Sequence, residues 1–140
     1  MRKKMIIRFC AAIITIVWSV SDAKEIKYSE KELHQFVVSF ANDMNKQLPM
    51  FIDKETRVDS VIPYKKTFIY MCSLPYINYD EFNYSEIKVL KEKELVNNVC
   101  TNKSMSMLAK QHGYSFVWVY YDKTGKELIR FSVDGKKCGK

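Results

Sequence analysis

Few side chains in this sequence could do chemistry, and they are scattered. A structural zinc site needs four cysteine or histidine ligands, and the two histidines, His34 and His112, fall on different predicted helices without such a group around them. A thiol enzyme would pair a cysteine with an activating histidine, and Cys72 with His112 is the candidate pair, but neither residue lies in an activating motif. We therefore expect no metal site, and we keep a secreted thiol enzyme only as an alternative.

Other catalytic signatures are also missing. The adjacent carboxylates Asp80 and Glu81 lie beside aromatic residues, which suggests a carbohydrate hydrolase, but neighbouring carboxylates are usually just solvated side chains. The sequence contains no Cys-x-x-Cys pair and no glycine-rich phosphate loop. We expect a non-enzymatic protein without catalytic residues or cofactor, and a small secreted hydrolase is a second alternative.

The first 23 residues have the three parts of an export signal. Basic residues at positions 2, 3, 4 and 8 precede an apolar run from Phe9 to Val20, and Ser21-Asp22-Ala23 suits signal peptidase. The apolar run is shorter than the roughly 20 residues that a bilayer-spanning helix needs. We expect cleavage after Ala23, a periplasmic or secreted protein, and no stable membrane anchor once the signal is removed.

The remaining residues, 24–140, are enough for one domain and too few for two. The signal takes four of the 23 basic residues and one of the 16 acidic residues, which leaves a net charge of +4. Lysine and arginine are interspersed with aspartate and glutamate in nearly every segment, whereas a nucleic-acid-binding protein concentrates its basic residues on one face. We expect a mixed-charge surface and no nucleic-acid partner.

Three cysteines remain after cleavage, so three disulfide pairings are possible. We favour Cys100 with Cys138, because the segment between them folds back as a hairpin and returns the chain toward its start. Cys72 then keeps its thiol, which we expect to be buried and inert because it lies in an apolar strand. A bond from Cys72 to another chain is the alternative.

One helix has a complete sequence signature. Ser29 and Glu32 form a capping box at its start. Apolar residues spaced three and four apart between positions 33 and 44 give this helix one buried stripe, and it ends before Pro49.

Two further helices are expected in the middle of the chain. Ser85 could cap a charged helix from Glu86 to about Val99, whose periodicity is weaker. Thr101 offers the N-cap of a short helix that follows, and Gly113 is placed to end it in a left-handed conformation.

Four segments have the composition and alternation of β-strands: 56–62, 66–74, 114–121 and 127–133. The last two flank Asp122-Lys-Thr-Gly125, whose glycine fits the left-handed position of a hairpin turn. Together with the helices, these strands predict an α+β fold.

The connector between the second predicted strand and the charged helix is rich in aromatic residues. Tyr76, Tyr79, Phe82 and Tyr84 are spaced through it, and tyrosine offers large, rigid, amphipathic contact area. This segment is therefore our candidate partner-binding site. The alternative is that these rings pack over the edge of the sheet.

The order of the later motifs resembles the small periplasmic pilotins of bacterial type II secretion. The shared pieces are Leu48-Pro49-Met50 before a strand, the run 98–102 around Cys100, Gly113-Tyr114, the hairpin turn 122–126, and Cys138. The resemblance implies an antiparallel-rich sheet of about four strands, an N-terminal helix and two central helices packed on one face, and the Cys100–Cys138 disulfide. Those pilotins are lipoproteins, whereas this chain has no lipidation cysteine at the predicted cleavage site.

These observations predict a non-enzymatic exported accessory protein, pilotin-like without a lipid anchor. The resemblance implies that it binds a peptide or protein partner in the periplasm, in a groove beside its sheet. An immunity or inhibitor protein for a secreted toxin is a further alternative.

Overall fold

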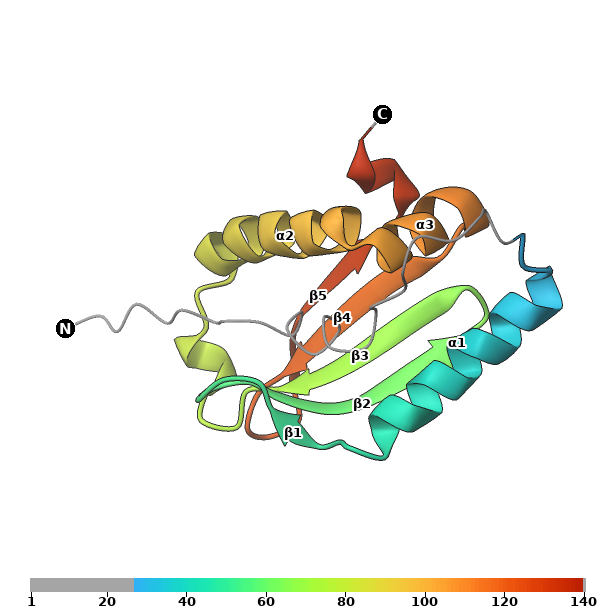
Figure 1. Cartoon of the computed structure of the whole chain (residues 1–140). Helices are drawn as coiled ribbons and strands as arrows, with labels where there is room; N and C mark the ends of the chain where they lie inside the picture. Colours follow the sequence, from blue (N-terminus) through green and yellow to red (C-terminus); the bar gives the residue numbers. More distant parts are fainter. Residues whose placement is uncertain (1–26, 140) are drawn as a thin grey trace.

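The computed structural model describes residues 27–139, which form three α-helices and one five-stranded sheet (Figure 1). The predicted export signal and its cleavage site after Ala23 lie outside the described residues. In chain order the elements are α1 (Glu30–Asn45), β1 (Met50–Phe51), β2 (Arg57–Tyr64), β3 (Thr67–Ser73), the 3₁₀ turn η2 (Tyr79–Glu81), α2 (Tyr84–Thr101), α3 (Lys103–His112), β4 (Ser115–Tyr121), β5 (Glu127–Val133) and the 3₁₀ turn η3 (Gly135–Cys138).

The sheet is mixed and has the strand order β1-β2-β3-β4-β5. Strands β3 and β4 are parallel, because α2 and α3 carry the chain from the end of β3 back to the start of β4, and the other neighbours are antiparallel. The predicted strand count of about four is wrong. The additional strand, β1, is two residues long and pairs Met50 with Val58 and Phe51 with Arg57, so it leaves no alternating pattern in the sequence.

Helix α1 confirms its sequence signature. The Ser29 side chain accepts a hydrogen bond from the Glu32 amide, and the Glu32 carboxylate accepts one from the Ser29 amide, which completes the capping box. The predicted stripe faces the sheet, with Leu33, Val37, Ala41 and Met44 buried. The helix packs against β2.

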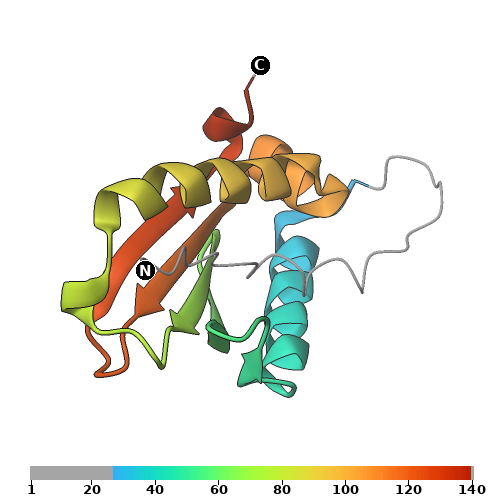
Figure 2. The same cartoon turned by 90° about the vertical axis from the view of Figure 1, so that its left-hand side faces the viewer.

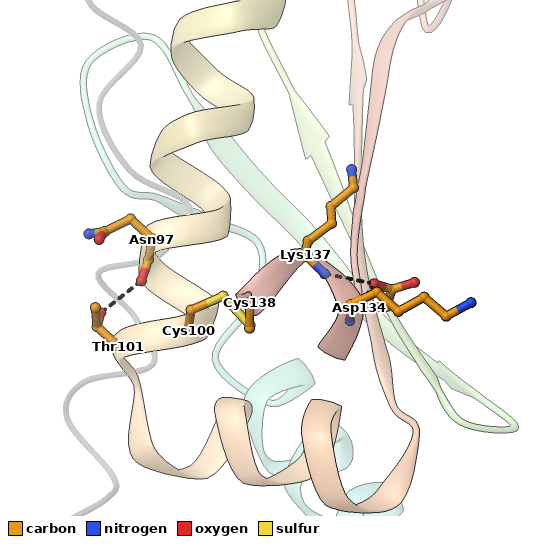
Figure 3. Close-up of a disulfide and its surroundings, with 7 residues drawn as sticks. Asn97, Cys100, Thr101, Asp134, Lys137 and Cys138 are labelled. Carbon is orange, nitrogen blue, oxygen red and sulfur yellow. Dashed lines mark hydrogen bonds between the residues drawn. A yellow bond between two sulfur atoms is a disulfide. The ribbon is translucent and has the colours of Figure 1, made fainter. Parts of the chain in front are cut away.

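Helices α2 and α3 exist as predicted, but their N-caps differ from the prediction. The Asn83 side chain caps α2 instead of Ser85, and the Asn102 side chain accepts hydrogen bonds from the amides of Ser104 and Met105 at the start of α3. The Thr101 hydroxyl instead donates to the Asn97 carbonyl inside α2 (Figure 3). Asparagine is as good an N-cap as serine or threonine, so the sequence alone does not show which of two neighbouring residues caps the helix. Gly113 ends α3 in the left-handed conformation, as predicted.

All three helices cover one face of the sheet, as expected. Alternate residues of the central strands point to that face and are buried. Their rings stack across the parallel pair of β3 and β4: the ring centroids of Phe68 and Phe116 are 5.5 Å apart, and those of Tyr70 and Trp118 are 5.1 Å apart. Helix α1 lies on the β2 side of the sheet and α2 on the β5 side (Figures 1 and 2). No helix among residues 27–139 is long and apolar enough to cross a bilayer.

A disulfide joins Cys100 near the end of α2 to Cys138 at the end of η3, which confirms the favoured pairing (Figure 3). Their Cα atoms are 5.2 Å apart. The ion pair between Lys137 and Glu92, with 2.6 Å between Nζ and Oε1, lies between the same two elements. Cys72 is buried in β3 and takes no part in this disulfide.

Candidate partner-binding surface

The structure places three of the four predicted aromatic contact residues on the surface. The side chains of Tyr76, Tyr79 and Tyr84 are 69%, 45% and 50% exposed. Phe82 instead lies partly buried against the core, so it anchors the segment from beneath. Residues 75–84, the aromatic segment, therefore combine one inward ring with three outward ones.

Asp122 holds the aromatic segment in place. Its carboxylate accepts hydrogen bonds from the Thr124 hydroxyl (2.7 Å), from the Thr124 and Lys126 amides (2.8 and 2.9 Å), and from the Tyr79 amide (3.2 Å). The first three bonds shape the β4–β5 turn and the fourth reaches η2. The Lys123 amide adds a bond to the Ile77 carbonyl at 3.0 Å. The turn and the aromatic segment are thus one hydrogen-bonded unit.

The same bonds change the acidity of Asp122. The Thr124 hydroxyl makes the largest contribution, and with the amides of Lys126, Thr124 and Tyr79 it lowers the pKa of this carboxyl from 3.8 to about 2, although desolvation opposes the shift. The sequence pattern places Asp122 in the hairpin turn. Its bond to Tyr79 was missed, because that contact joins residues 43 positions apart.

Two of the exposed rings carry a lysine over one face. Lys126 Nζ lies 3.3 Å from the centroid of the Tyr79 ring, and Lys88 Nζ lies 5.5 Å from that of Tyr84. Such cation–π contacts orient the rings. They leave Tyr76 as the most exposed of the three tyrosines.

Tyr76 borders an open hollow of about 460 Å³. The other lining residues are Phe51, Ile52, Asp53 and Lys54, which come from β1 and the loop after it. One Asp53 oxygen, Oδ1, accepts from the amides of Glu55 and Thr56, both at 2.7 Å, and so fixes that loop. The lining of the hollow therefore combines two aromatic rings, those of Phe51 and Tyr76, with the charged residues Asp53 and Lys54.

The second face of the sheet, called here the open face, has no helix over it within residues 27–139. Cross-strand register places Ile62, Ile69 and Val117 in one row and Met71 beside Val119 in the next. At its margins Phe51, Ile62 and Tyr64 are 49%, 44% and 59% exposed. Phe51 belongs to both the open face and the lining of the Tyr76 hollow, so the two surfaces adjoin at this residue.

The residues considered for catalysis are not brought together. The Lys66 amine, just before β3, donates to the His112 carbonyl, so His112 lies near the start of that strand. Cys72 lies six residues after Lys66, or about 20 Å further along the strand at the usual rise per residue, so the two candidate residues are far apart. Asp80 and Glu81 are exposed in η2, and Glu81 bonds to Asn78. His34 is exposed on α1. No group of three potential metal ligands occurs in the described part of the chain.

Comparison with protein families places most of the domain in a known family. Residues 32–129 match the family described as "Domain of unknown function (DUF8479)", which covers most of the domain. No curated protein sequence matches the chain.

Three solved structures share the fold at low sequence identity. PA3611 of Pseudomonas aeruginosa, provisionally described as a secreted protein, aligns with a TM-score of 0.67 and 16% identity, over 81% of this chain and 100% of its own. The type II secretion pilotins EpsS of Vibrio vulnificus and AspS of Vibrio cholerae give TM-scores of 0.60 and 0.56, with 15% and 14% identity. They cover 79% and 77% of this chain and 96% and 94% of their own. At these identities the likeness is one of fold.

Proposed function

Because this chain belongs to the family described as "Domain of unknown function (DUF8479)", we propose its function from its fold and surface: it is an exported, non-enzymatic accessory protein that binds a protein or peptide partner. The binding surface of this proposal is the aromatic segment with the adjoining Tyr76 hollow. The observation that carries the proposal is that the chain exposes three tyrosines on a segment fixed by a buried carboxylate.

Physical chemistry supports a binding role for this surface. Exposed aromatic rings are enriched at protein interfaces, and rings on a fixed segment lose little conformational freedom when a partner binds. The pilotin fold of EpsS and AspS, which are components of type II secretion, adds an analogy for an accessory role. Export is part of the proposal because residues 1–23 have the three parts of a cleavable export signal.

Photocrosslinking tests the proposal in cells that make the full chain. A photoreactive amino acid at position 76 should give an adduct with one protein, and the same amino acid at Lys110, exposed on α3, should not. Once mass spectrometry has identified that protein, Tyr76→Ala should weaken its binding by about tenfold or more, and Lys110→Ala should leave it unchanged. Identical adducts from both positions, or none from position 76, would contradict a binding role for the aromatic segment.

A further inference from the structure

The edge of β5 presents backbone hydrogen-bonding groups to the outside of the sheet. The Ser115 amide donates to Lys66 and the Tyr121 carbonyl accepts from Leu74, so odd-numbered residues of β4 turn their backbone groups toward β3. Even-numbered residues of β4 therefore face β5, where they are opposite Val133, Phe131 and Ile129. By alternation, the backbone groups of Arg130 and Ser132 point away from the sheet, and both residues are exposed.

The opposite edge of the sheet is closed. Strand β1 pairs with the start of β2. Further along, the Asn45 side chain donates to the Val61 carbonyl (2.7 Å) and accepts from the Val61 amide (2.8 Å), so it imitates a neighbouring strand. Pro63, two residues later, has no amide hydrogen to offer. Such devices prevent strand pairing at sheet edges.

Strand β5 has none of these devices. Residues 127–133 contain no proline, and within residues 27–139 no side chain bonds to the backbone of Arg130 or Ser132. We propose that this edge binds an extended segment of a partner protein, which adds to the sheet as a sixth strand beside β5. This site is separate from Tyr76, so it goes beyond the proposed function and succeeds or fails independently of it.

The helix layer decides which occupant fits. Helix α2 packs against β5. A second copy that paired through its own β5 would bring a second α2 to the same edge, where neighbouring strands are spaced about 4.8 Å apart but packed helices need 8–10 Å. An extended segment without a helix over it meets no such obstacle. Its side chains would alternate, apolar ones toward the helix side and polar ones beside Arg130 and Ser132 on the open face.

Amide exchange measured by NMR on the free protein tests the geometry. The Arg130 and Ser132 amides should exchange at least about a hundredfold faster than those of Phe131 and Val133, which are hydrogen-bonded to β4. Equal protection of all four amides would contradict an open edge. Sedimentation should show a monomer. A dimer in which the Arg130 and Ser132 amides are protected would mean that the edge binds a second copy of this chain, and it would contradict the proposal.

A random 12-residue peptide library displayed on phage is the probe for binding. Selected peptides should protect the Arg130 and Ser132 amides, and Ser132→Pro, which removes one of them, should weaken binding by about tenfold. Ser132→Ala keeps the amide and should bind as the wild-type chain does. If Ser132→Pro fails to fold, the protection pattern on the wild-type chain decides the question. Peptides that protect other amides, or a library without binders, would overturn the proposal.

Discussion

Asp122 is the residue on which the aromatic segment depends. Its pKa falls to about 2 in the folded chain, below its ordinary value of 3.8, because four donors stabilise the charged form. A carboxyl with a lowered folded pKa contributes stability above about pH 4 and loses that contribution as the pH falls toward 2.

We therefore expect Asp122→Asn to lower the melting temperature at pH 7 and to flatten the stability profile between pH 4 and pH 2. The matched control is Asp80→Asn, an exposed carboxylate in the same segment. Thermal unfolding followed by circular dichroism at a series of pH values measures both. If the melting temperature of Asp122→Asn depended on pH in the same way as that of the wild-type chain over that interval, the Asp122 carboxylate would not be the source of this stability.

Asn45 offers a second test at the level of one side chain. Asn45→Ala removes both bonds to Val61 and should reduce the free energy of unfolding by about 1–3 kcal/mol. Asn42→Ala, an exposed change on the same helix, should cost much less. Urea unfolding measures the difference, and equal losses would show that the amide does not hold the edge.

At the scale of the elements, Gly135 allows the 3₁₀ turn η3 to approach α3 closely. A Cβ on Gly135 would lie 2.6 Å from the Ala109 carbonyl oxygen and 3.1 Å from the Lys110 Cα, so backbone would have to move. We expect Gly135→Ala to cost about 1–3 kcal/mol of unfolding free energy. Lys136→Ala, exposed beside it, is the control. A Gly135→Ala chain as stable as the control would contradict the close approach of η3 to α3.

The disulfide acts at the same place. Closing a loop between residues 38 positions apart stabilises the folded chain by about 4 kcal/mol in the chain-entropy model. Replacing Cys100 and Cys138 together by serine should therefore lower the denaturation midpoint, as should reduction of the native chain. A midpoint that reduction leaves unchanged would count against this contribution.

Elements with local signatures could be predicted from the sequence, and those defined by distant contacts could not. Helix α1 was predicted because its cap and its stripe are encoded within 16 residues. Helix α2 was also predicted, but its periodicity is weaker because Val89 and Leu90 are exposed. Strand β1 exists only through its pairing with β2.

The candidate surface shows the same division. Aromatic spacing indicated the exposed tyrosines, but the inward turn of Phe82 depends on the core beneath it. The composition and alternation of residues 66–74 predicted the strand β3. That Phe51 belongs to both the open face and the Tyr76 hollow depends on the pairing of β1 with β2.

At the scale of the whole molecule, export is the prediction with the widest consequence. Protein purified from the native compartment should begin at Lys24 and contain one disulfide. Its remaining thiol, on buried Cys72, should react with an alkylating reagent only after denaturation. Intact mass before and after alkylation measures all three properties. An uncleaved N-terminus would contradict the predicted signal, and rapid alkylation of the native chain would contradict the burial of Cys72.

The Cys100–Cys138 disulfide also determines how the molecule responds to mechanical load. Strand β5 lies at the edge of the sheet, and a pull on the chain that follows it would otherwise break its hydrogen bonds to β4 one at a time. Because Cys138 is bonded to Cys100, tension applied at the C-terminus passes into α2 before it reaches β5. A processive protease that advanced from the C-terminal side would meet that covalent stop before it reached β5.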